Sequence, residues 1–150
     1  MRKRICAIGL LVFLCAAATR AALAQTHGCT VEKMKQAEKE TDNLKSWELV
    51  YEFYETYSRC DDGGVAEGVS DKIAKLLANH WSSVAEFVSI ANNDKKFEKF
   101  VLRHVDATID WEHDGPKIHE NAQLHCPVNL KQMCRELMAR STPPRDMGPK

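Results

Sequence analysis

The stretch LKSWELVYEFYETYSRC, residues 44–60, decides the fold of this chain. Its apolar side chains recur at intervals of three and four, the spacing that places side chains on one face of an α-helix. They are Leu44, Trp47, Val50, Tyr51, Phe53, Tyr54 and Tyr57. An aromatic ligand-binding box would use the same residues, but an amphipathic helix needs such a face in any case. We therefore predict a helix over 44–59 whose stripe packs into a core.

The chain from Cys29 onward repeats this helical pattern, and no stretch alternates apolar and polar residues with the period of a strand. DDGG (Asp61–Gly64) is expected to end the helix over 44–59, because paired glycines lower helix stability. Further helices are expected over 30–41, 65–81, 84–91 and 95–109, then from about 116, and finally over 130–140. The sequence thus predicts an all-α fold, a single compact bundle of about six to seven short helices in one domain at 25–140.

Side chains that satisfy free amide groups mark several of the expected helix starts. Thr30 is the expected N-cap of the first helix, and Asn129 that of the last. SVAE (Ser83–Glu86) has the pattern of a capping box. NND (Asn92–Asp94) is expected to end one helix and cap the next. Pro116 suits a first helical turn, where its missing N–H breaks no bond.

Residues 1–24 have the pattern of a cleaved secretory signal peptide. MRKR supplies a basic start, ICAIGLLVFLCAAA an apolar run that is short for a membrane span, and ALA (22–24) the small-residue cleavage site. Cys15 and Cys29 lack the preceding residues that lipoprotein processing requires. We expect a periplasmic or secreted protein with no membrane attachment after cleavage. Residues 141–150, STPPRDMGPK, are expected to form a flexible tail.

Cleavage changes the charge of the chain. The signal holds four basic residues and no acid, so Lys and Arg fall from 21 to 17 against 21 Asp and Glu, a net charge of −4. Nucleic acids and anionic membranes are bound by basic patches, so neither is expected as a partner.

The mature chain keeps four cysteines: Cys29, Cys60, Cys126 and Cys134. An even number in an oxidising compartment indicates two disulfides, and four cysteines allow three pairings. Cys29 and Cys60 would meet at the open end of a hairpin formed by the first two helices. Pro127 to Asn129 can fold the chain back so that Cys126 meets Cys134. In the loop-entropy model the two bridges contribute roughly 3.5 and about 2.5 kcal/mol.

Two near-motifs for metal binding lie between residues 110 and 125. HENAQLH places His119 and His125 six residues apart, about 120° around a helix, whereas a zinc protease helix needs a spacing of four. DWEHDG places Asp110, Glu112 and Asp114 as in a calcium loop, but the twelfth position is Asn121. We assign no metal and no cofactor, and treat calcium in the 110–115 turn as an open alternative.

No nucleophile elbow or phosphate-binding glycine loop is present, so a non-enzymatic protein-binding role is expected. The acidic CDDGG turn offers Asp61 and Asp62 as partner-binding residues. DWEHD offers Trp111, an aromatic anchor, between Glu112 and Asp114. Packing of Trp111 into the core is the alternative.

The stretch LKSWELVYEFYETYSRC is similar to the Trp- and Tyr-rich, cysteine-containing helix of the periplasmic immunity proteins that neutralise type VI secretion amidase effectors. The combination of signal peptide, near-continuous helices and disulfides also resembles that group. The resemblance implies a stoichiometric inhibitor that blocks a toxin's active-site cleft, and it allows a homodimer. A periplasmic structural or envelope factor, an extracellular effector, and a calcium-binding or enzymatic protein are the alternatives.

Overall fold

The computed structural model describes residues 28–106 and 108–142. All regular secondary structure in these residues is helical. The expected signal peptide, residues 25–27 of the expected domain and residues 143–150 of the expected tail lie outside these described residues. The helices are α1 (Val31–Glu40), α2 (Trp47–Tyr57), α3 (Gly63–Asn79), α4 (Val84–Asn93), α5 (Lys95–Arg103), α6 (Asp114–Leu124) and α7 (Lys131–Arg140). The all-α prediction is confirmed.

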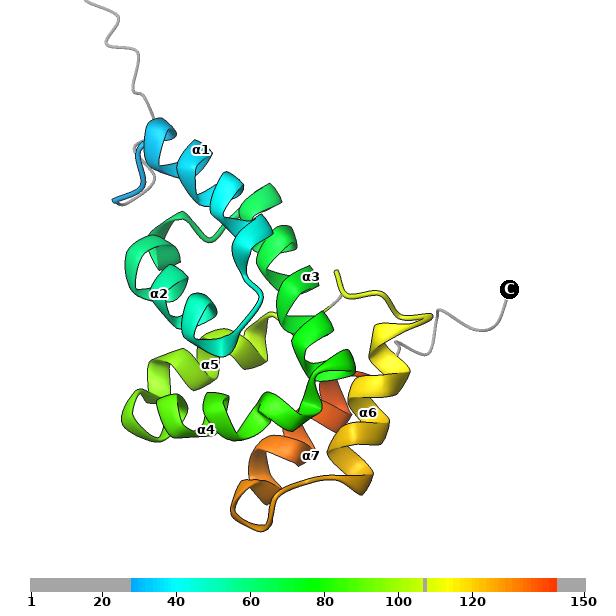
Figure 1. Cartoon of the computed structure of the whole chain (residues 1–150). Coiled ribbons are helices and arrows are strands. Elements are labelled where there is room, and N and C mark those ends of the chain that lie inside the picture. The colour runs from blue at the N-terminus through cyan, green and yellow to red at the C-terminus, as the bar shows by residue number, and fades with distance from the viewer. Residues whose placement is uncertain (1–27, 107, 143–150) are drawn as a thin grey trace, which may run out of the picture.

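The long helix α3 connects the two ends of the bundle (Figure 1). It packs on α1 near its start and on α6 near its end, while α7 packs on α6. Asn121 of α6 donates its side-chain amide to the carbonyls of Leu77 and Ala78, at 2.9 and 3.0 Å. Helix α2 packs against α1, α4 and α5.

The aromatic stripe of α2 lies in the core, as predicted. Trp47 is fully buried and its ring lies 4.9 Å from Phe87 of α4. Tyr51 contacts Phe97 of α5 edge-on, with ring centroids 5.0 Å apart. Tyr51 and Tyr54 are only half-buried, so the outer edge of the stripe reaches the surface. Aromatic pairs of this kind contribute about 0.5–1.5 kcal/mol each beyond the area that they bury.

Both predicted disulfides are present. Cys29 pairs with Cys60, with a Cα–Cα distance of 5.1 Å, and Cys126 pairs with Cys134, at 6.1 Å. The first bridge joins the residue before the N-cap of α1 to the turn after α2, and it holds these two helices as a hairpin. The second closes the short connection between α6 and α7.

The predicted helix starts are partly wrong. Thr30 caps α1 and Asp94 caps α5, as expected. Helix α2 begins at Trp47 and not at Leu44, because a 3-10 turn at Thr41–Asn43 intervenes and Ser46 accepts the N–H of Leu49.

The predicted capping box at Ser83–Glu86 and the predicted cap at Asn129 are both absent. Ser83 stays in the right-handed helical region because a 3-10 turn at Trp81–Ser83 runs directly into α4, so its side chain caps nothing. Asn129 lies inside a 3-10 turn at Val128–Leu130, and α7 begins at Lys131. At the C-terminal boundary Ser141, assigned to the tail by sequence, is buried and donates its hydroxyl to the carbonyl of Leu137.

The hydroxyl of Ser83 has a tertiary role instead. It accepts the indole N–H of Trp47 at 3.0 Å and donates to the carbonyl of His80 at 2.7 Å. Replacing Ser83 by alanine leaves the buried Trp47 N–H without its acceptor, and we expect a loss of about 1–3 kcal/mol in the free energy of unfolding. Urea unfolding measures this loss. The exposed neighbour Ser82, changed to alanine, is the matched control, and an equal effect of both changes would contradict the assignment.

Candidate protein interface

The structure separates the two aspartates of the predicted CDDGG surface. Asp62 is exposed, and its carboxylate accepts the N–H of Gly63 at the start of α3. The Asp61 side chain is only 5% exposed and faces α5. The Asp61 carboxylate is therefore largely shielded from solvent, whereas partner binding by this residue stays a prediction.

Asp61 belongs to a buried polar cluster that sequence analysis missed. One carboxylate oxygen lies 2.9 Å from Nε2 of His104, whose side chain is 3% exposed. The other oxygen pairs with the guanidinium of Arg103, which is largely exposed. Nδ1 of His104 lies 2.8 Å from the carbonyl oxygen of Phe100. The cluster ties the turn after Cys60 to the end of α5.

The neighbours of Asp61 favour its ionised form. Burial by itself raises the pKa of the Asp61 carboxyl, but the hydrogen bond and charge of His104, together with Arg103, outweigh burial and lower that pKa. The Asp61 carboxylate and both ring nitrogens of His104 find their polar partners within the protein, and this gives the pair a structural role.

The DWEHD turn is also built around its own hydrogen bonds. The carboxylate of Asp110 accepts the backbone N–H groups of Glu112 and His113, and the bond from His113 lowers the pKa of that carboxyl. Asp114, another predicted partner-binding residue, is buried at the first turn of α6. In the described part of the chain no three His, Cys, Asp or Glu side chains gather in a way that could hold a metal ion.

Trp111 lies half-buried against the core, so the structure agrees with the packing alternative for this residue. A side chain at Gly115 would lie 3.2 Å from the Trp111 ring, which shows how closely the indole covers the start of α6. Glu112 remains exposed. Of the five predicted partner-binding residues, the structure leaves Asp62 and Glu112 exposed, at two separate places.

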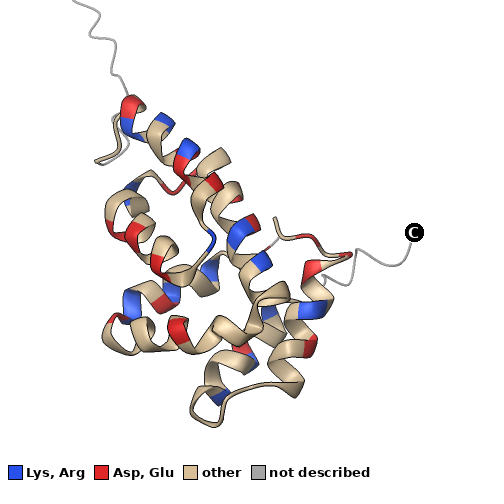
Figure 2. Cartoon of the chain, in the orientation of Figure 1, with Lys and Arg blue, Asp and Glu red and all other residues tan. Residues whose placement is uncertain are grey.

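A different surface, on α2, has the features of an interface. We call it the α2 ridge and define it by the exposed side chains of this helix: Glu48, Leu49, Glu52, Glu55 and Thr56. Helix α2 contains three glutamates and no Lys or Arg (Figure 2). Leu49 is 38% exposed and is one of four large apolar side chains that are exposed in the described residues. An apolar side chain among charges is typical of a protein contact.

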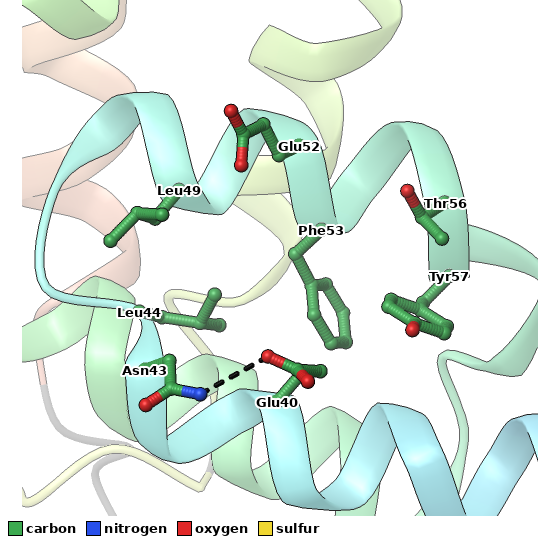
Figure 3. A pocket seen from close by; sticks show the side chains of 8 residues that line it. All are labelled: Glu40, Asn43, Leu44, Leu49, Glu52, Phe53, Thr56 and Tyr57. Atoms are coloured by element: carbon green, nitrogen blue, oxygen red, sulfur yellow. Dashed lines mark hydrogen bonds between the residues drawn. The ribbon is translucent and has the colours of Figure 1, made fainter.

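An open pocket lies on the α1 side of the ridge (Figure 3). Its volume is about 220 Å³. Leu44, Phe53 and Tyr57 are buried side chains that form its floor. Figure 3 shows Glu40 of α1 directed toward the ring of Phe53, with Asn43 donating to the Glu40 carboxylate at 3.1 Å. Glu52 lies on the α2 side. The pocket therefore combines an apolar floor with carboxylates at its edge.

A larger and more open groove lies on the α4 side of the ridge. Its volume is about 560 Å³. It is lined by Glu48 and Tyr51 of α2 and by Glu86, Ser89, Ile90 and Asn93 of α4. Partial desolvation raises the pKa of the Tyr51 hydroxyl, and the charges of Glu55 and Asp94 raise it further.

A third hollow lies between α1 and α3, with a volume of about 170 Å³. Its charged lining residues are Glu38 and Asp62. Each of these three hollows thus carries two carboxylates and no Lys, Arg or His.

The sequence contained a signal for the α2 ridge, since Glu48, Glu52 and Glu55 recur at helical spacing opposite the apolar stripe. A solvated helix face gives the same pattern, so the spacing alone could not identify an interface.

Comparisons with protein-family models, with curated proteins and with solved structures gave no match to this chain. None of the described helices is long and apolar enough to cross a membrane.

Proposed function

We propose that this protein is an exported helical module that binds one protein partner and inhibits it stoichiometrically, as immunity proteins inhibit secreted toxins. The observation that carries the proposal is the α2 ridge, where exposed Leu49 lies among glutamates and an open hollow lies on each side of the helix. Specific interfaces combine an apolar centre with a polar rim, and the ridge offers both within one helix.

Export rests on two features of the chain. Residues 1–24 have the order of a secretory signal peptide. The four remaining cysteines form two disulfides, which persist in oxidising compartments and are rare in the cytosol. The periplasm or the cell exterior is therefore the proposed place of action.

The rigidity of the ridge supports an inhibitory role. The Cys29–Cys60 bridge closes the open end of the α1–α2 hairpin, and Trp47 anchors the start of α2 in the core. A surface that is fixed before binding loses little conformational entropy in the complex. Such preorganisation favours the tight, long-lived binding that a stoichiometric inhibitor requires.

The test is protection of cells. The full chain and a version that begins at Gln25 are expressed beside the periplasm-directed product of the neighbouring gene. We expect the full chain to restore growth and to purify with that product at a 1:1 ratio, whereas the version without residues 1–24 does not protect. Growth arrest that the full chain does not relieve, with no complex on gel filtration, would refute the inhibitor function.

A further inference from the structure

We infer that the partner contacts this protein through a Lys- or Arg-bearing amphipathic segment that lies along the α2 ridge and places its cationic side chains in the α2–α4 groove. The inference rests on the proposed function, since it names the partner chemistry that the same surface accepts.

The first argument is the state of the carboxylates. Glu48 and Glu86 stand on the two walls of the groove, and both are exposed. The ion pairs of the described residues involve Asp61, Asp71, Glu98 and Asp110. No carboxylate of the groove takes part in any of them. The negative charge on this surface is therefore open to a cation from a partner.

The second argument is the wall between the carboxylates. Tyr51 and Ile90 contribute an aromatic ring and an aliphatic side chain to the groove. A guanidinium or ammonium is attracted to the face of an aromatic ring, and the alkyl stem of Lys or Arg packs on apolar surface while its head meets a carboxylate. An anionic or purely apolar segment would leave Glu48 and Glu86 unpaired at the contact, and that costs free energy.

The third argument places the segment on the α4 side of the ridge. Lys33 of α1 lies over the ring of Tyr57, 5.8 Å from its centroid, and so puts a cation at the end of the smaller α1-side pocket. No Lys, Arg or His lines the α2–α4 groove. At about 560 Å³ the groove has room for more than one long side chain. Ile90 and the ring of Tyr51, which line the groove itself, supply the apolar contact for the segment's own apolar face.

The test uses a defined probe and the oxidised protein. An 18-residue amphipathic peptide of Lys and Leu is titrated into isotope-labelled protein and followed by amide chemical shifts; the same peptide with Glu for Lys is the second probe. We expect the basic peptide to shift residues 47–57 and 84–93 and the acidic peptide to leave them unchanged. We expect the affinity to fall several-fold when NaCl is raised from about 50 to about 300 mM.

Charge reversal locates the contact. E48K/E86K is expected to weaken binding of the basic peptide about tenfold or more. E67K/E120K changes the net charge equally at exposed sites on α3 and α6 and is expected to leave the affinity within about twofold. Circular dichroism checks that both variants fold. Equal effects of the two reversals, shifts confined to other helices, or equal binding of the acidic peptide would overturn the inference.

The same variants separate this inference from the proposed function. If the wild-type chain neither binds nor neutralises the neighbouring gene product, the inhibitor function fails, whatever the peptides show. If the wild-type chain neutralises that product and E48K/E86K does so with unchanged affinity, the function stands and the placement of the partner on the α2–α4 groove is wrong.

Discussion

Replacing Asp61 by alanine is expected to lower the free energy of unfolding by about 3 kcal/mol, because the buried Nε2 of His104 loses its hydrogen-bond partner. His104 is buried and its ring nitrogens have two polar contacts, one to Asp61 and one to the Phe100 carbonyl. Loss of the Asp61 carboxylate removes the polar contact of Nε2. Urea unfolding at neutral pH measures the change.

Two further substitutions test the reason for this loss. Asparagine at position 61 can donate an amide N–H to Nε2 of a neutral His104, so Asp61→Asn is expected to be destabilised less than Asp61→Ala. Arg103 is 63% exposed, so its own pairing with Asp61 is expected to contribute no more than about 1 kcal/mol, and Arg103→Gln measures this. If Arg103→Gln were as damaging as Asp61→Ala, the exposed pair and not His104 would hold the turn.

The cluster also sets an acid limit for stability. The folded-state pKa of Asp61 is lowered, so its contribution is complete above the ordinary pKa of an aspartate, about 3.9, and is lost as pH falls through the lower folded value. We expect the stability difference between the wild type and Asp61→Asn to shrink as the pH falls from about 5 to below 4. Unfolding midpoints over this range measure it. A difference that grows toward low pH would show that the sign is wrong.

Loss of the Cys29–Cys60 bridge is expected to have the other large effect. In the loop-entropy model, a cross-link across 31 positions contributes roughly 3.5 kcal/mol, and one across 8 positions about 2.5. The double variants Cys29→Ser/Cys60→Ser and Cys126→Ser/Cys134→Ser should therefore rank in that order by urea unfolding. Both losses are large against the 5–15 kcal/mol stability typical of a domain.

The Cys29–Cys60 variant also tests the interface. This bridge holds α1 against α2, so its loss is expected to weaken partner binding as well as stability, whereas loss of Cys126–Cys134 should affect stability alone. A binding titration at low temperature, where both variants are fully folded, separates the effect on partner binding from the effect on stability. Equal weakening by both variants would contradict a contact on the α2 ridge.

Much of the fold could be predicted because its signals are local. The stripe of Trp47, Val50 and Phe53 repeats within one helix, and Thr30 and the aspartate of NND cap helices through amides two or three residues away. The disulfide pairing followed from the hairpin that the helix lengths imply. Such features depend on chain spacing, which the sequence states directly.

The errors arose where a local pattern competed with a distant partner. Ser83 matches a capping box, but its hydroxyl accepts from Trp47, 36 residues earlier in the chain. Asp61 follows a cysteine in a polar turn, yet its carboxylate meets His104, 43 residues later. His104 in an apolar stripe was a sign that a buried partner was needed, but the sequence could not say which carboxylate it would be.

The sequence by itself determined that this chain forms helices and which of their faces are apolar, because helical periodicity is a property of neighbouring residues. Only the tertiary structure decided which polar groups remain available to a partner. Asp61 and Asp114 are turned inward, while Glu48 and Glu86, from different helices, face one groove. That choice depends on how α2 packs against α4 and α5, and packing is settled by contacts between residues far apart in the chain.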